Sequence, residues 1–429
     1  MMRNYTILLV FFLGSLQIFA QDSTSTFKKR VLEGTEIDFL GSYYSQDGNN
    51  AAVTGGLGTE KLTDAAPTVV VSIPINDDDV LTIDAGISAY TSASSSNIDP
   101  FDTNYADPFT ASSGASSSDT WANVTGSYSH SNDDRNRIVS GKVSFSNEYD
   151  YTSIGFGGSY TWLFNEKNTE FTLHGNVYLD TWKIIYPYEL RPYAQNRTFT
   201  YQNAASLGYA PAFRELTEKG RNSYSLGLNF SQILTERLQG SLLVDLVLQQ
   251  GLLSTPFQRV YFQDFQDFFI DDFQLADDIE HLPDSRLKTA VGGRLNYYLN
   301  QTFVLRSYYR FYRDDWGIVS HTASLEVPVK LNDKFTVYPS YRYYQQSAAD
   351  YFAPYNTHLS SEEYYTSDFD LSDFQANQYG IGINYTDIFT SLKIGSMGLK
   401  TIDLKYDYYQ RDSGLHANII TFGLGFTEN

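Results

Sequence analysis

Apolar and polar side chains alternate with a period of two residues through most of the chain, and no other feature limits the possible folds so strongly. In the segment 323–331, Leu325 and Val327 alternate with Ser324 and Glu326. Successive side chains of a β-strand point to opposite faces, whereas a helix cannot separate charged from apolar groups at this spacing. One apolar and one polar face per strand is the pattern of a membrane barrel, with lipid outside and a polar lumen inside.

We count about sixteen segments of this kind, and many exceed the ~10 residues that a tilted strand needs to cross a membrane. We expect the excess length to project outside as extended hairpins. Nothing inside the chain resembles a domain boundary, so the sequence predicts a single all-β, antiparallel, up-and-down transmembrane barrel over residues 33–429. The segments cover approximately 33–46, 66–76, 80–92, 120–132, 135–148, 150–164, 168–183, 222–234, 236–251, 285–300, 301–316, 317–331, 333–349, 374–390, 398–411 and 415–427.

The lengths of the links between these segments give a second, independent indication. Links after even-numbered segments are nearly all short turns, at 76–79, 132–134, 165–168 and 331–334, with a looser stretch at 391–398. Every long link follows an odd-numbered segment, at 47–65, 93–119, 184–221, 252–284 and 350–373. Bacterial barrels have short periplasmic turns and long extracellular loops. The asymmetry therefore predicts the orientation, and the even number of segments predicts that both ends of the barrel lie in the periplasm.

The first 20 residues have the organisation of a secretory signal peptide. Arg3 supplies the positive charge, an apolar stretch runs from Ile7 to about Phe19, and cleavage after Ala20 leaves Gln21 as the mature start. A membrane-spanning helix is the alternative, but the apolar run is too short and lacks flanking anchors. Residues 21–32 then form a short periplasmic segment, too short for the globular plug of energised transporters.

Composition agrees with a barrel and excludes several other classes of protein. Aromatic residues make up 16% of the chain, as expected for aromatic girdles at both membrane interfaces. The chain has no cysteine, which excludes disulfides, thiolate metal sites and thiol catalysis. A net charge of -20 gives no basic surface for binding nucleic acid. The mean hydropathy of -0.33 is too low for a helical membrane bundle.

The final segment ends in the alternating string TFGLGF at 421–426. A last strand that finishes on an aromatic residue resembles the assembly signal of outer-membrane proteins, although the tail 427–429 departs from a terminal aromatic. We therefore expect the barrel-assembly machinery to fold the chain into the outer membrane of a Gram-negative-type bacterium, in contact with lipid and lipopolysaccharide. An ordinary final strand is the alternative.

Long strings in the second half of the chain make it recognisable. They read FQRVYF at 257–262, HLPDSR at 281–286, SYYRFYRDDWGI at 307–318, YYQQSAADYFAPY at 343–355 and YYTSDFD at 364–370. The chain resembles a family of bacterial outer-membrane proteins known as domain of unknown function 3570. The likeness covers most of the mature chain and is densest in the C-terminal half. It implies an outer-membrane β-barrel, and because the family has no assigned catalytic residues, no functional residue is carried over from it.

Charged residues on the polar faces are the first candidates for a functional site. Four arginines point inward from three nearby segments, and five further charged residues point inward as well. These candidates are Arg294, Arg306, Arg310, Arg342, Asp245, Glu326, Asp403, Lys405 and Asp407. Facing rows of opposite charge at a constriction filter ions or bind an anionic solute. The alternative is pairing of these charges across an interior filled by side chains, although a barrel of about sixteen strands is wide enough for an aqueous channel.

The link 257–278 interleaves aromatic residues with aspartates. So many aromatic groups would not stay in water, and we expect them to fold over the mouth or into the lumen as a lid. The candidate lid residues are Phe262, Phe265, Phe268, Phe269 and Phe273. This lid is a gate, a ligand-recognition element or a loop that packs on its neighbours. Calcium binding by the aspartates of the link stays open, since calcium takes oxygen ligands, although their spacing does not match an EF-hand.

Three other outer links also contain candidate binding residues. The serine-rich stretch 91–120 resembles a flexible outer loop, and its Asp99, Asp102 and Asp107 form a second calcium candidate. The aromatic residues of 186–209 and 351–365 either stack on sugars or have a structural role.

Enzymatic chemistry finds little support. The 6 histidines are scattered and include no HExxH motif and no pair at ligand spacing. Ser320 and His321 are adjacent, so their side chains face opposite sides of a strand. The sequence predicts no catalytic residue, cofactor or metal site.

The leading hypothesis is an outer-membrane channel or transporter for a small solute, in which long external loops gate a charged lumen. A non-transporting barrel that anchors or surrounds another envelope protein is the second hypothesis, from a different class. An outer-membrane enzyme is the third.

Overall fold

The computed structural model describes residues 30–91, 119–191, 208–270 and 273–428 of the chain. The expected signal peptide lies outside the described residues, as do most of the serine-rich link and its three aspartates, Asp99, Asp102 and Asp107.

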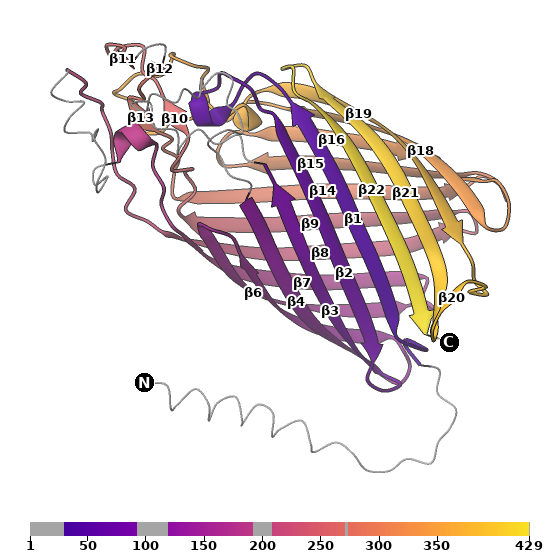
Figure 1. Cartoon of the computed structure of the whole chain (residues 1–429). Helices are drawn as coiled ribbons and strands as arrows, with labels where there is room; N and C mark the ends of the chain where they lie inside the picture. The colour runs from indigo at the N-terminus through magenta and orange to yellow at the C-terminus, as the bar shows by residue number, and fades with distance from the viewer. Residues whose placement is uncertain (1–29, 92–118, 192–207, 271–272, 429) are drawn as a thin grey trace, which may run out of the picture.

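One closed antiparallel sheet forms nearly all of the molecule (Figure 1). Each strand pairs with the next along the chain, and β1 pairs with β22 from Glu36↔Thr427 to Asp47↔His416, which closes the barrel. Of the 18 strands in the sheet, β17 and β20 are two-residue pieces, so the barrel has 16 full strands, the number that the alternation predicts. They are β1 (Glu36–Asp47), β2 (Leu62–Pro74), β3 (Asp79–Tyr90), β4 (Asp119–Ser131), β5 (Arg137–Asn147), β6 (Tyr151–Phe164), β7 (Thr169–Trp182), β8 (Gly220–Thr235), β9 (Leu238–Gly251), β14 (Ser285–Tyr298), β15 (Val304–Asp314), β16 (Val319–Glu326), β18 (Phe335–Gln346), β19 (Phe374–Thr386), β21 (Met397–Arg411) and β22 (His416–Glu428).

Two segments differ from the sequence prediction in detail. The expected strand 317–331 is split at Pro328 into β16 and the short β17 (Val329–Lys330), because proline has no N–H to donate to the next strand. The expected strand 374–390 stops at Thr386. The turn that follows contains β20 (Lys393–Ile394), which pairs with the start of β21.

The outer wall is apolar, as the alternation predicts. Large side chains such as Val143 (55% exposed) and Ile381 (56% exposed) lie on it without protein contacts to cover them. Such exposure is tolerated where lipid, rather than water, is the solvent. Within the described ranges, no helix is long and apolar enough to cross a membrane.

Most of the fully buried side chains belong to the long connections between strands. These connections gather at one end of the barrel (Figure 1). These connections contain the short strands β10 (Arg259–Val260), β11 (Phe269–Ile270), β12 (Phe273–Gln274) and β13 (Asp278–Ile279) and the one-turn helices η2 (Ala52–Thr54), η4 (Tyr188–Leu190) and η5 (Phe369–Leu371). The C-terminus lies at the opposite end, where the turns are short (Figure 1). By the usual asymmetry of bacterial barrels, the end with the long connections is extracellular.

Candidate functional site

Four extracellular connections meet over the mouth of the barrel, and we call the structure that they form the cap. They are the connections between β1 and β2, β7 and β8, β9 and β14, and β18 and β19. The β9–β14 connection touches all the others. In the order of the sheet it lies opposite the β1–β2 connection, with eight strands on either side. A contact between these two connections therefore crosses the mouth.

Arg259 makes that contact. Its Nε and Nη2 donate to the two carboxylate oxygens of Glu189, at 2.6 and 3.1 Å, and its Nη1 donates to the carbonyl oxygen of Val53 at 3.0 Å. Both charged side chains are 0% exposed. Glu189 belongs to the β7–β8 connection and Val53 to the β1–β2 connection. One side chain thus ties three parts of the cap together, in a site that water does not reach.

A second buried network joins the β9–β14 and β18–β19 connections. The Tyr365 hydroxyl donates to Asp278 Oδ2 at 2.5 Å and accepts a hydrogen bond from Arg214 Nη2 at 2.7 Å. Nearby, Glu280 accepts hydrogen bonds from the Thr366 hydroxyl and the Thr255 backbone N–H. The two connections are therefore joined by polar contacts as well as by apolar packing.

Burial, reinforced by the neighbouring Asp368 carboxyl, raises the pKa of Glu280 to about 8, and burial raises the pKa of Asp277 to about 6. Around neutral pH Glu280 is therefore largely protonated within the cap. Deprotonation places a charge in a site from which water is excluded.

The candidate lid residues belong to the cap. Phe262 (1% exposed) and Phe273 (7% exposed) are buried in it, the first against Tyr365. Phe268 packs on Tyr209, and Phe265 packs on Phe262. Phe269 is 51% exposed. The lid covers the mouth as a folded layer with its own apolar core.

All nine candidate charges lie on one face of the sheet. The register aligns Arg294 with Tyr308, Tyr308 with Ser324 and Ser324 with Arg342 across four neighbouring strands. The remaining candidates occupy alternate positions of their strands that point to this same face. The apolar residues at the positions between them point the other way and form the outer wall. The luminal candidates are Arg294, Arg306, Arg310, Arg342, Asp245, Glu326, Asp403, Lys405 and Asp407.

Some luminal charges are paired with each other. Arg306 bonds Glu326 at 2.9 Å, Lys405 lies 3.0 Å from Asp407, and His174 lies 3.4 Å from Asp245. Arg306 and Glu326 lie on adjacent strands, and Lys405 and Asp407 lie on the same strand. His174 on β7 reaches Asp245 on β9 across Gly227 of β8, so all three pairs run along the wall and do not cross the lumen.

Two groups of charges outside these pairs lie on different parts of the wall. The basic arc consists of Arg294, Arg310 and Arg342 on β14, β15 and β18. The acidic arc consists of Asp38, Asp84 and Asp403 on β1, β3 and β21, and Asp403 accepts hydrogen bonds from the Tyr338 hydroxyl and the Asn384 amide. Opposite charges on separate parts of one wall set up a field across the lumen.

Luminal tyrosines lie along the wall because glycines on neighbouring strands make room for them. A Cβ atom added to Gly382 would collide with the Tyr338 ring, and one added to Gly292 would meet Tyr308. Tyr338 crosses β19 in this way to reach Asp403 on β21. Rings held over glycines in this way project less into the lumen. In agreement, Arg294 and Arg342 are exposed and the Arg306 side chain is 56% exposed.

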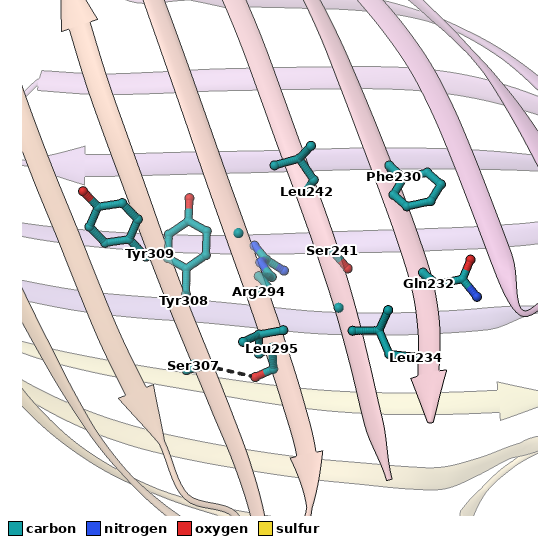
Figure 2. A pocket seen from close by; sticks show the side chains of 12 residues that line it. Phe230, Gln232, Leu234, Ser241, Leu242, Arg294, Leu295, Ser307, Tyr308 and Tyr309 are labelled. Atoms are coloured by element: carbon teal, nitrogen blue, oxygen red, sulfur yellow. Dashed lines mark hydrogen bonds between the residues drawn. The ribbon is translucent and has the colours of Figure 1, made fainter. Parts of the chain in front are cut away.

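Figure 2 shows the wall from β8 to β15. Leu242, Leu295 and Tyr309 line a hollow of about 430 Å³ with their neighbours on the outer face, whereas the same strands carry Arg294 and Tyr308 on the luminal face. The dashed line is the 3.2 Å hydrogen bond that the Ser307 hydroxyl donates to the Leu295 carbonyl oxygen. That bond satisfies the hydroxyl group where lipid offers no partner.

Neither metal binding nor hydrolysis finds a site in the described part of the chain. It contains no group of three or more histidine or carboxylate side chains placed to hold a metal ion. Ser320 is buried on the luminal face, whereas His321 bonds the Tyr309 hydroxyl on the outer face, so this pair does not form a catalytic dyad.

Sequence reasoning missed the two residues that hold the cap together, Arg259 and Glu189, although Arg259 stands in one of the recognisable strings. It also passed over Asp38 as a luminal charge, which the same alternation would have found. For the buried pair there was no local signal, because its partners are 70 residues apart in irregular connections.

Comparison with known proteins gives one family and several structures of similar fold. The family model described as "Protein of unknown function (DUF3570)" matches residues 20–423. No curated protein matches the chain.

Solved structures match over nearly the whole chain at low identity. A bacterial polysaccharide outer membrane secretin matches at 9% identity over 93% of this chain and 100% of its own, with a TM-score of 0.46. OccK2 (OpdF) of Pseudomonas aeruginosa, in complex with glucuronate, matches at 9% identity over 94% and 100%, with a TM-score of 0.41. A BenF-like porin of Pseudomonas fluorescens matches at 8% identity over 92% and 99%, with a TM-score of 0.41. Likenesses of this size carry no information about solute or mechanism.

Proposed function

Since this chain belongs to the DUF3570 family, whose members have no assigned function, we propose from its geometry that it is a gated outer-membrane channel for small hydrophilic solutes. The solute would cross the lumen by diffusion, past the two charged arcs, when the cap opens. The proposal involves no catalytic step and no cofactor.

The observation that carries the proposal is the solvent-exposed charge on the luminal wall. Sixteen strands spaced about 4.8 Å apart and tilted by about 40° give a backbone radius of roughly 16 Å, which side chains lying along the wall do not fill. Exposed Arg294 and Arg342 support a water-filled lumen, because an isolated charge in a dry interior is very costly. Within the described ranges, most turns at the periplasmic end are short, such as 236–237, and cannot fold back over that end.

The cap supplies the gate. It has its own buried core and an ion pair from which water is excluded, and in this proposal the packed cap is the closed state of the mouth. Opening requires the β9–β14 connection to part from its neighbours, and the bonds of Arg259 are among those that must break.

The same cap is the observation that favours the second candidate, a barrel that binds an envelope partner without transporting solute. A well-packed extracellular layer is also what a receptor or anchor needs. In either case we infer that lipid and lipopolysaccharide surround the barrel and that the assembly machinery inserts it.

Recording currents across planar bilayers separates the two candidates. A channel gives stable, ion-selective conductance steps, and a variant that lacks residues 257–278 gives longer openings than the wild type. Replacing Arg306 and Arg310 with alanine shifts the reversal potential towards cation selectivity. Silence from both the wild type and the deletion variant, with correctly folded barrels, contradicts the channel and supports the partner-binding barrel.

A further inference from the structure

Three arginines in the lumen have no acidic partner. Among the residues that the structure describes, no carboxylate lies within 4 Å of the guanidinium groups of Arg294, Arg310 or Arg342, although Arg306 on the same wall is paired with Glu326. The Arg294 guanidinium lies over an aromatic face, 5.2 Å from the centre of the Tyr308 ring. Their charges are therefore available to a solute.

The register brings the three residues together. Arg294 and Arg342 are aligned through Tyr308 and Ser324, which places their Cα atoms three strand spacings, or about 14 Å, apart. Arg310 stands two residues, or about 7 Å, beyond Tyr308 along β15 and between the other two in strand order. Long, flexible arginine side chains can converge on one anion from these positions.

The surroundings add hydrogen-bond donors, and the carboxylate of Glu326, diagonal to Arg342 on β16, is paired with Arg306. Ser324 lies between Tyr308 and Arg342 in the aligned row. Thr322, the direct neighbour of Arg310 on β16, is 3% exposed, and its hydroxyl oxygen has no hydrogen-bond partner in the structure. Such a hydroxyl gains a partner when an anion or its water binds beside Arg310.

We propose that Arg294, Arg310 and Arg342 form a subsite for the oxyanion group of a small solute, a carboxylate or a phosphate. The planar guanidinium binds both groups through paired N–H donors, and the exposed position allows release as well as entry. This inference rests on the proposed channel function and names the class of solute that the channel selects. The acidic arc disfavours anions on its own part of the wall and so confines them to the arginines.

The test measures anion binding directly. Isothermal titration of detergent-solubilised protein with citrate, inorganic phosphate and acetate would show saturable binding of at least one of them. Arg310→Gln and Arg342→Gln each weaken that binding about tenfold or more, since each removes charge-assisted hydrogen bonds. Lys142→Gln is the matched control, because Lys142 is a luminal cation on β5, distant from the row in strand order, and its loss removes the same charge without affecting the affinity.

The outcomes distinguish a wrong subsite from a wrong function. A citrate response without a phosphate response, or the reverse, identifies the favoured oxyanion. Equal weakening by Lys142→Gln and Arg342→Gln, or no saturable binding of any of the three anions, overturns the subsite. If such a protein still conducts in bilayers, the channel stands and only the solute class is wrong. If anions bind but no current flows, the subsite stands and the channel is wrong.

Discussion

Replacing Arg259 with methionine should open the cap. The substitution leaves the Glu189 carboxylate buried and unpaired, and breaking a buried ion pair in this way costs about 3–5 kcal/mol. It also removes the hydrogen bond to Val53, which crosses the mouth. At about 1.4 kcal/mol for each factor of ten, the ratio of closed to open caps should fall roughly 10²- to 4 × 10³-fold.

Two readouts follow this change: the open probability in planar bilayers, and hydrogen exchange at cap amides such as those of Gln263 and His281, which bond across to the β18–β19 connection. Both should rise in Arg259→Met. Adding Glu189→Leu removes both charges and should restore most of the closure. Lys183→Met is the control, since Lys183 begins the β7–β8 connection that also carries Glu189, and its ammonium donates to the exposed Tyr149 hydroxyl between β5 and β6. An Arg259→Met protein with wild-type exchange and wild-type open probability would refute the role of this ion pair.

The pH dependence of opening and the packing of the luminal wall provide further tests. Because burial raises the pKa of Glu280 to about 8, the closed cap favours its protonated form, and the resulting stabilisation is complete below the ordinary carboxyl pKa and is lost as pH rises to about 8. Open probability should therefore increase between about pH 5 and 8 in the wild type and change much less in Glu280→Gln, and identical profiles would contradict this. Gly382→Ala should push the Tyr338 ring off the wall, break its bond to Asp403, cost about 1–3 kcal/mol and lower the single-channel conductance. Gly126→Ala, which has open space around the new Cβ atom, should change neither quantity, and equal effects of the two substitutions would remove the support for a thin luminal wall.

The barrel could be predicted from the sequence because lipid and water impose a local rule on every strand. Val143 and Lys142 are neighbours in β5, and their opposite environments are visible in the sequence as a period of two. The short turns could be predicted for the same reason, since residues such as Asn332, whose side chain accepts the Lys334 and Phe335 backbone N–H groups, act within a few positions. Local chemistry thus accounts for the strand number and for the separation of the charged face from the apolar face.

The cap could be predicted only in part. The aromatic content of 257–278 indicated that the link must be covered, and Phe262 and Phe273 are buried, but Phe269 on β11 is exposed. The contacts that decide the packing join Arg259 to Glu189 and Tyr365 to Asp278, at separations of 70 and 87 residues. No periodicity marks such contacts, since they depend on where the closed sheet brings each connection.

The most direct test of the account is the accessibility of a single cysteine in the lumen, which is straightforward because the natural chain has none. Ser324→Cys, between Tyr308 and Arg342 on the luminal wall, is reconstituted in oriented vesicles and treated with a charged, membrane-impermeant thiol reagent. We expect rapid labelling from the periplasmic side, slow labelling from the extracellular side, and rapid labelling from both sides when Arg259→Met is added. No labelling from either side would show that side chains fill the barrel, and it would contradict the water-filled, capped lumen on which the proposed function depends.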